Sequence, residues 1–232
     1  MAHASGALQT KDLARVTVDT TVQPKNIAFP TDAKLLHAAI KGLMHAPEVE
    51  CIGKGKAHRP YEFGVKVSLA TTLHRSRGGQ FIAHVKAMPG NPYDGHTLAT
   101  VLPEIEAQIG APLTRVVADR GYRGHNAPPD MKFRVYVSGQ RRGVTDAIKR
   151  ELRRRSAVEP VIGHAKAEHR MGRNFLKGAH GDAANAVLAA AGYNFRRLLA
   201  WLAALWRAFI IVILAAAKPP IPCQTARGRL SS

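Results

Sequence analysis

The stretch RVVADRGYRG, residues Arg115–Gly124, decides the fold, because it combines a buried strand with an acid at the end of that strand. Residues 116–118 are three small apolar side chains, a pattern that is typical of a strand covered on both faces. Asp119 follows directly, and two arginines, Arg120 and Arg123, stand beside it. The functional crevice of an open α/β sheet lies outside the carboxyl ends of its strands. The stretch therefore predicts a carboxylate at the sheet edge where a site is expected.

Segments on both sides of this stretch alternate between strand and helix patterns. Residues 15–22, RVTVDTTV, alternate valine with polar side chains and predict a half-buried strand. This order of segments indicates an α/β fold in which helices flank a mixed sheet. The other predicted elements are a short helix ending at Gly42, paired strands over 61–72 and 80–90, a helix over 96–109, a strand over 133–139, and helices from 146 onward with a break at GAHGD, 178–182.

The charge of the chain is strongly positive. Its 34 lysines and arginines outnumber its 16 aspartates and glutamates, which gives a net charge of +18 at pH 7. An excess of this size favours a polyanionic partner, above all nucleic acid, whose affinity depends on phosphate contacts. A generally basic surface and an anionic membrane are the alternatives. The basic loop GKGKAHRP, residues 53–60, lacks the glycine spacing and the Ser/Thr of a P-loop, so that motif is excluded.

Cysteine use and the N-terminal sequence indicate the compartment. Cys51 and Cys223 lie far apart and form no C-x-x-C pair, which excludes a disulfide framework and a structural zinc site. The first 18 residues contain no apolar core of a secretory signal. We therefore expect a cytoplasmic protein that, given its charge, is associated with the nucleoid.

One apolar run, Leu198–Ala217, is long enough, judged by its number of residues, to span a bilayer. Arg207 interrupts the run near its middle, where a charge in lipid is costly, and the run is rich in alanine. We therefore expect a core helix or an interface helix, and no membrane partner.

Two aspartates stand at predicted strands. Asp19 is unusual, because aspartate is depleted inside strands and its neighbours Thr17, Val18 and Thr20 are strong strand formers. Such a conflict between local propensity and residue choice is expected at functional positions. Asp119 by itself is also compatible with a simple turn, since Asp followed by Arg-Gly is common after a strand.

A third acid lies on a predicted helix. Glu159 follows Arg155 by four residues, and Lys166 follows Glu159 by seven. At about 100° per residue, these three side chains fall on one narrow stripe of a helix. The alternative is a solvated helix face with an ordinary i,i+4 ion pair. Pro160 within this segment predicts a possible kink that would make the stripe approximate.

Taken together, the three acids favour a metal site. Carboxylate oxygens suit Mg²⁺ or Mn²⁺ and do not suit zinc. Two such ions about 3.5–4 Å apart support in-line phosphoryl displacement. In a basic protein that carries out this chemistry on DNA, the acids would hold the metal ions and the basic surface would hold the DNA. The segment HAKAEH, 164–169, matches neither zinc-binding spacing H-E-x-x-H nor H-x-x-E-H, so we interpret its histidines as surface residues.

Three segments resemble the catalytic blocks of DDE-type transposases from bacterial insertion sequences. They are VTVDTTVQPKNIAFPTDAKLL, VVADRGYRGH, and the segment that begins RSAVEPVIGHAKAEHRMGRN. Arg155, Glu159 and Lys166 match the spacing of the R-x3-E-x6-K signature in one branch of that family. Ordered matches cover nearly the whole chain from Arg15 to Leu199.

The resemblance implies an RNase H-like catalytic core with a helical C-terminal extension. It implies that Asp19, Asp119 and Glu159 bind two Mg²⁺ or Mn²⁺ ions and act in catalysis. The implied reaction is metal-dependent cleavage at the ends of the element and attack of the freed 3′-hydroxyl on target DNA. The partners would be double-stranded DNA and further copies of the chain in an active homo-oligomer. The resemblance implies that Arg155 and Lys166 contact DNA near the scissile phosphate. We also expect DNA contacts from further basic residues, namely Arg120, Arg123, Lys54, Lys56, Arg170 and Arg173.

Three departures from the family pattern shape these expectations. Leu152 stands where the signature has a tyrosine, Asp19 leaves no room for a preceding DNA-binding domain, and residues 40–50 look short. We therefore expect a truncated or internally deleted copy, and a catalytically inactive DNA-binding remnant or a poorly folding one is the alternative to an active enzyme. The predicted organisation is a tail over 1–14, the catalytic domain over 15–180, a helical segment over 181–217 and a flexible tail over 218–232.

Overall fold

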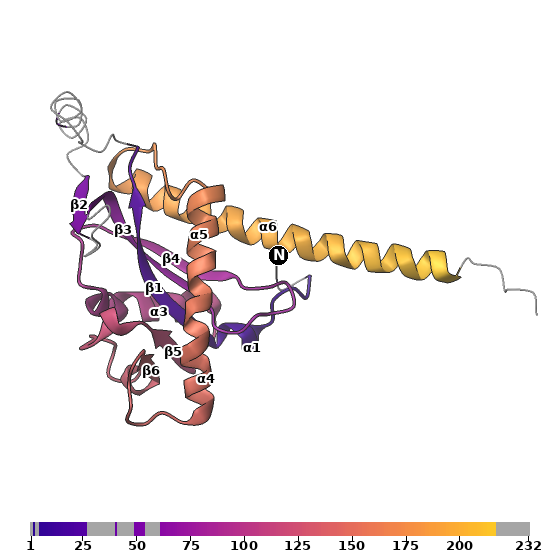
Figure 1. The fold of residues 1–232 in the computed structure, drawn as a ribbon, viewed down its shortest axis with the longest axis horizontal. Coiled ribbons are helices and arrows are strands. Elements are labelled where there is room, and N and C mark those ends of the chain that lie inside the picture. The colour runs from indigo at the N-terminus through magenta and orange to yellow at the C-terminus, as the bar shows by residue number, and fades with distance from the viewer. Residues whose placement is uncertain (1, 3–4, 27–39, 41–48, 54–60, 217–232) are drawn as a thin grey trace, which may run out of the picture.

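One mixed sheet forms the centre of the molecule. The structure, a computed structural model, describes residues 2, 5–26, 40, 49–53 and 61–216. Within these residues six strands pair in the order β2-β3-β1-β5-β6, and β4 also pairs with β3 (Figure 1). The strands are β1 (Arg15–Pro24), β2 (Glu50–Gly53), β3 (Tyr61–Thr72), β4 (Ile82–Met88), β5 (Arg115–Ala118) and β6 (Val135–Val137).

Strand direction changes across the sheet. β3 runs antiparallel to β1, β2 and β4, whereas β5 runs parallel to both β1 and β6. Parallel strands need a crossover connection, and between β4 and β5 this includes the 3₁₀ turn η1 (Asp94–Thr97) and the helix α3 (Leu98–Ile109). Gly110 ends α3 in the left-handed conformation at φ 70°, which suits glycine because it has no Cβ.

Helices cover both faces of the sheet. α3 packs on the face that carries Val16 and Val18, whose burial with the helix side chains forms the largest apolar cluster. On the other face, Leu69 packs with residues of α5 (Val158–Glu168) and α6 (Gly178–Ala216). The side chain of Asn194 on α6 also bonds the backbone amide and carbonyl of Ile82, at 2.9 and 2.8 Å, which fixes α6 on β4. The predicted α/β arrangement with a mixed sheet is thus confirmed.

A buried carboxylate attaches the next helix to the sheet. Glu151 lies on α4 (Asp146–Arg154), whose N-cap residue is Thr145. The Glu151 residue is only 4% exposed. It binds Arg115 of β5, Arg15 of β1 at 2.9 Å and His74 at 3.3 Å. Burial opposes the charge of Glu151, but the hydrogen bonds from Arg115 and His74 outweigh it and lower the pKa of this carboxyl. This arrangement sets the position of the 3₁₀ turn η4 (Arg155–Ala157), which follows α4 directly.

Several predicted element limits are corrected by the structure. The expected break at 178–182 is wrong, because these residues form the first turns of α6 and the non-helical stretch lies at 169–177. The segment 133–139 begins as the 3₁₀ turn η3 (Lys132–Arg134), and only β6 pairs. Pro160 makes no break within α5, because it lies in the first turn, where its missing amide is not needed. The predicted helix ending at Gly42 lies outside the described residues, apart from Ile40.

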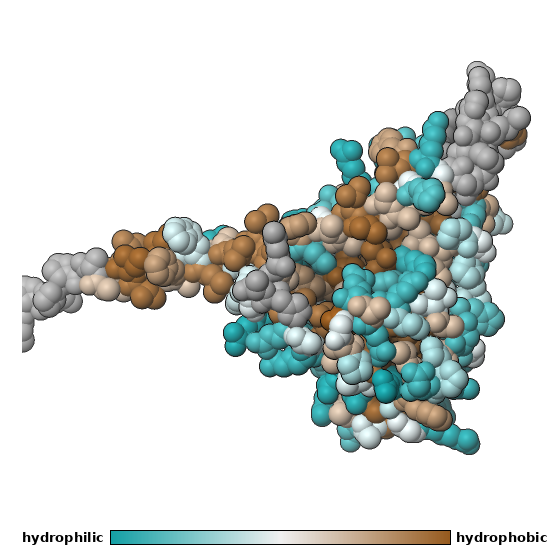
Figure 2. Space-filling view, turned by 180° about the vertical axis from the view of Figure 1, so that it is seen from behind, coloured by the Kyte–Doolittle hydropathy of each residue, from teal (hydrophilic) through white to brown (hydrophobic). Residues whose placement is uncertain are grey.

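The C-terminal helix continues well beyond the domain. Its buried residues end at Leu198, and the large apolar side chains from Leu202 onward are exposed, Trp206 and Ile211 by more than 60%. Figure 2 shows this apolar surface on the protruding helix. In the described part of the chain, α6 is one helix that is long and apolar enough to cross a membrane, judged by length and composition alone.

The N-terminal residues pack against the same helix. Ala7, Leu8 and Leu13, the last of these in the short helix α1 (Thr10–Leu13), form an apolar cluster with Phe81 and Leu198. The expected domain boundary between 180 and 181 falls inside α6, which is continuous. The predicted domain limits themselves stay predictions.

Candidate functional site

Asp19 and Asp119 lie at matching positions on neighbouring parallel strands. The β1–β5 ladder pairs Thr17 with Val117, and each aspartate lies two residues beyond its paired residue. Because side chains alternate along strands, both aspartates continue the face opposite to α3, on which α5 packs. The negative charge of Asp119 acts on Asp19, which shows that the two carboxyls are electrostatic neighbours.

Asp19 is held in a restricted environment. Its side chain is 14% exposed, and it accepts hydrogen bonds from the Thr20 amide at 2.9 Å and from Arg155 Nη1 at 3.2 Å. Burial raises the pKa of Asp19 to about 6, and the charge of Asp119 adds to this effect, whereas Arg155 lowers it. The carboxyl is thus held charged at neutral pH in a place that disfavours the charge.

Asp119 begins a tight turn after β5. Its Oδ1 accepts a hydrogen bond from the Gly121 amide at 2.7 Å, which caps the 3₁₀ turn η2 (Arg120–Tyr122). Tyr122 is fully buried beneath this turn. Burial raises the pKa of its hydroxyl well above the usual range, and the charges of Asp19, Asp94 and Asp119 raise it further. The turn that the sequence predicted therefore also brings a phenol close to the acids.

Arg155 connects the third predicted acid to the first. While Nη1 binds Asp19, Nη2 of the same guanidinium binds Glu159 Oε1 at 3.0 Å. Glu159 is 63% exposed, whereas Arg155 is 18% and Asp19 14% exposed, so the bridge runs from a largely enclosed carboxyl to one at the protein surface. Lys166, the third member of the predicted stripe, lies about two turns after Glu159 on α5. Its Nζ is 3.7 Å from a carboxylate oxygen of Glu62 on β3.

A fourth acid, which the sequence analysis did not single out, lies beside this group. Asp94 begins η1, and its Oδ1 forms an ion pair of 2.9 Å with Lys66 of β3. The charge of Asp94 also raises the pKa of Asp19. Its signal in the sequence is weak, because Asn-Pro-Tyr-Asp-Gly is a typical turn composition in which aspartate needs no further explanation.

A polar cleft opens beside these acids. Its volume is about 720 Å³, and it is lined by Asp94, Asp119, Lys66, Thr20, Thr21, Val22, Ile52, Gly53, Asn91 and Tyr93. An apolar pocket of about 380 Å³ lies elsewhere, between the N-terminal segment and α6. Because the polar cleft holds two of the acids, it is the better candidate for a site that binds a hard cation.

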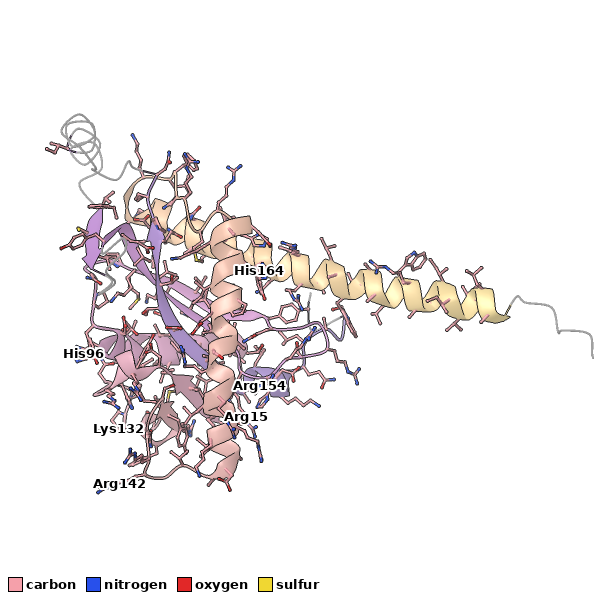
Figure 3. The ribbon with its side chains drawn as sticks, viewed as in Figure 1. Arg15, His96, Lys132, Arg142, Arg154 and His164 are labelled. Atoms are coloured by element: carbon pink, nitrogen blue, oxygen red, sulfur yellow. The ribbon has the colours of Figure 1, made fainter. Side chains whose placement is uncertain are left out.

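The other predicted DNA-binding residues occupy varied positions. The guanidinium groups of Arg120 and Arg123 both lie near Gly139, after β6. Arg173 donates a hydrogen bond to Asn26 Oδ1 at 2.7 Å, and Arg170 takes a left-handed backbone at φ 61° just before it. Lys54 and Lys56 lie outside the described residues. Figure 3 shows further basic side chains, among them Arg15, Arg154, Lys132 and Arg142, at the end of the domain near α4, β5 and β6.

The histidines near the end of α5 have structural contacts. His164 forms a hydrogen bond with Glu168 at 3.0 Å, and Arg196 of α6 also binds Glu168. The His169 ring packs edge-on against Tyr193, with the centroids 6.2 Å apart. These contacts support the interpretation of this segment as a helix surface.

The acid group suits a hard divalent cation by its chemistry. Asp19, Asp119, Asp94 and Glu159 supply only carboxylate oxygens, the ligands that Mg²⁺ and Mn²⁺ prefer. As the side chains lie, Arg155 forms ion pairs with Asp19 and Glu159, and Lys66 forms one with Asp94. No three acidic, histidine or cysteine side chains in the described part of the chain are close enough to form a complete metal shell. Asp119 and Asp19 are the residues best placed to begin one.

Fold and site together define an α/β domain with one aspartate inside β1 and a second directly after the adjacent parallel strand β5. The family model described as a transposase DDE domain matches residues 32–195, well over half of the chain. The chain therefore belongs to the DDE transposase family, and its sheet is an RNase H-like core. The match includes Asp119 and Glu159 and begins after Asp19. No curated protein and no solved structure matches the chain.

Replacing Asp19 with asparagine is expected to stabilise the protein at neutral pH. The folded-state pKa of about 6 lies above the ordinary value of 3.8, so the fold disfavours the charged carboxyl at pH 7. The neutral amide removes this cost, and we expect the free energy of unfolding to rise by roughly 1–3 kcal/mol. As pH falls through 6 toward 3.8, Asp19 protonates more readily in the folded state. The advantage of Asp19→Asn should therefore shrink.

Urea denaturation of the wild type and Asp19→Asn at pH 7.5 and pH 4.5 measures this effect. The exposed Asp130→Asn substitution is the control, and it should leave the stability at both pH values unchanged. A variant that is less stable than the wild type at pH 7.5 contradicts the prediction.

Proposed function

We propose that this protein is the transposase of a bacterial insertion sequence and that it cleaves and joins DNA strands with divalent cations. The proposal rests on the arrangement of three acids: the β1–β5 register brings Asp19 and Asp119 to neighbouring positions on one face, and Arg155 bonds both Asp19 and Glu159. Asp19, Asp119 and Glu159 are the residues that we assign to metal binding and catalysis. The likeness to the transposase DDE domain supports this assignment.

Each residue of the site has a distinct part. Asp19 and Asp119 would hold Mg²⁺ or Mn²⁺, and Glu159 would join them from α5. When bound, such cations would supply Lewis-acid stabilisation of the charge on the reacting oxygens in an in-line phosphoryl displacement. Arg155 orients Glu159 toward Asp19 and offers a positive charge beside the position of the scissile phosphate. Because the Asp19 side chain is only 14% exposed, little water reaches its carboxylate.

Basic residues around the site would hold the DNA. The net charge of +18 supports strong, salt-dependent binding to a polyanion. Arg155, Lys166, Arg120, Arg123, Arg170 and Arg173 are the described residues that we assign to DNA contacts, and Lys54 and Lys56 belong to the same proposal. We further propose double-stranded element ends and target DNA as partners, a homo-oligomer as the active form, and a cytoplasmic location on the nucleoid.

Nicking of supercoiled plasmid tests the catalytic part of the proposal. The purified full chain is expected to convert supercoiled DNA to open circles with Mn²⁺ or Mg²⁺, and to leave it intact in EDTA. The conversion, measured on agarose gels against time, should slow steeply as the salt concentration rises, because phosphate contacts dominate binding. Salt-dependent binding without any cutting in Mn²⁺ would favour a protein that only binds DNA.

A further inference from the structure

We infer that Asp94 is a further metal-binding residue of the site, and that Lys66 is the internal counter-ion that a divalent cation displaces. In this arrangement Asp94 and Asp119 form a second carboxylate pair beside the pair of Asp19 and Asp119. The inference rests on the proposed function, because it adds a ligand to the same site.

The first support is the position of Asp94. A Cβ built on Gly121 would lie 3.0 Å from Asp119 Oδ1 and 3.1 Å from Asp94 Oδ2, so both oxygens border the same small space above this glycine. Both residues also line the polar cleft. Two carboxylates that come from different elements and face one space are a starting point for binding a hard cation.

The second support is the buried hydroxyl of Tyr122, which lacks a hydrogen-bond partner among the described residues. Tyr122 is 0% exposed, and no hydrogen bond from the described residues reaches its Oη, although the Thr20 side chain lies near. The charges of Asp19, Asp94 and Asp119 all act on this hydroxyl, which places it beside the acid group. A buried polar atom without a partner is costly. Because Mg²⁺ keeps several of its waters when it binds, a water of its hydration shell would donate a hydrogen bond to this oxygen.

The third support is the way Lys66 is held. Its Nζ binds Asp94 Oδ1 at 2.9 Å and donates to the Pro92 carbonyl at 2.8 Å, and its side chain is only 14% exposed. The ammonium thus supplies the positive charge that Asp94 requires. A divalent cation between Asp94 and Asp119 would take over this role, and Lys66 would keep its bond to Pro92. Lys66 therefore competes with the cation for Asp94.

Mn²⁺ titration calorimetry on the full chain tests the inference. Asp94→Asn is expected to weaken Mn²⁺ binding by about 10–100-fold or to remove one of the bound ions. Lys66→Met is expected to strengthen binding several-fold, because it removes the competitor. Glu104→Gln serves as the matched control, since Glu104 also forms an ion pair with a sheet lysine, Lys86, and does not line the cleft. It should leave Mn²⁺ affinity unchanged.

The outcomes separate this inference from the proposed function. If the wild type binds Mn²⁺, Asp119→Asn loses that binding and Asp94→Asn keeps it in full, only the role of Asp94 is wrong. If the wild type binds no Mn²⁺, the proposed function itself fails. Circular dichroism melts show whether Asp94→Asn folds. If it does not, Lys66→Met decides: stronger binding supports the inference, and unchanged or weaker binding overturns it.

Discussion

Asp119→Ala is expected to lower the rate of Mn²⁺-dependent plasmid nicking by at least about 1000-fold, which corresponds to about 4 kcal/mol of transition-state stabilisation. Asp119 directly follows β5, and its charge acts on Asp19 across the neighbouring strand. Without it, the remaining acids of the site are Asp19, Asp94 and Glu159, each of which faces a basic group. Such a site would not hold a cation between β1 and β5.

The second role of Asp119 requires a separate control. Its Oδ1 caps η2 through the Gly121 amide, and loss of such a cap costs about 0.5–2 kcal/mol of stability. Asp119→Asn keeps an oxygen for this bond and removes only the charge, so it should lose nicking and retain the wild-type melting temperature. DNA affinity, measured by fluorescence anisotropy, should stay the same or increase in both variants. Nicking at the wild-type rate in either variant would show that Asp119 is not part of the catalytic site.

Asp182→Ala is expected to reduce the free energy of unfolding by about 3–5 kcal/mol. Asp182 lies in the first turns of α6, and it forms an ion pair of 2.9 Å with Lys25 just after β1. Both side chains are more than 90% buried, and Asn174 also donates to Asp182 Oδ1 at 2.6 Å. Removing the carboxylate takes a buried negative charge away from the Lys25 ammonium and an acceptor away from the Asn174 amide. Urea denaturation monitored by circular dichroism measures the loss.

Two comparisons make this prediction specific. Asp146 pairs with Lys149 at the same distance of 2.9 Å on the surface, so Asp146→Ala should change stability by less than the measurement error. The double variant Lys25→Met with Asp182→Leu should recover much of the loss, because it replaces the buried ion pair with apolar groups. A loss below about 1 kcal/mol in Asp182→Ala would contradict the prediction, because the buried pair would then contribute no more than an exposed one.

Much of the fold was predictable, because local patterns determine the strands. The alternation in 15–22 and the apolar run at 116–118 follow directly from which faces are buried, and β1 and β5 form there. The continuous start of α6 was not predictable. Its sequence GAHGD is rich in glycine, but the distant Lys25 and Asn174 bind Asp182 and stabilise helical structure at this point. Contacts between residues far apart in the chain leave no local pattern.

Only part of the candidate site was likewise predictable from the sequence. Asp19 stood out because aspartate conflicts with its strand-forming neighbours, and Asp119 stood out because it follows a buried strand. Arg155 was placed on a stripe with Glu159, but its bond to Asp19 depends on how Glu151 holds α4 against β1 and β5. Asp94 was missed because its local sequence already explains an aspartate as a turn residue. Its closeness to Asp119 arises only when η1 and η2 meet in the folded protein.

The matching offsets of Asp19 and Asp119 limit how this chain can evolve. Side chains alternate between the two faces of a strand, so inserting or deleting one residue between Thr17 and Asp19 would turn that carboxylate toward α3. In the connections between strands no such alternation has to be kept, so insertions and deletions are tolerated far more easily there. Among related elements we therefore expect length variation to gather between the strands, whereas the spacing within β1 and β5 stays constant even where the individual side chains drift.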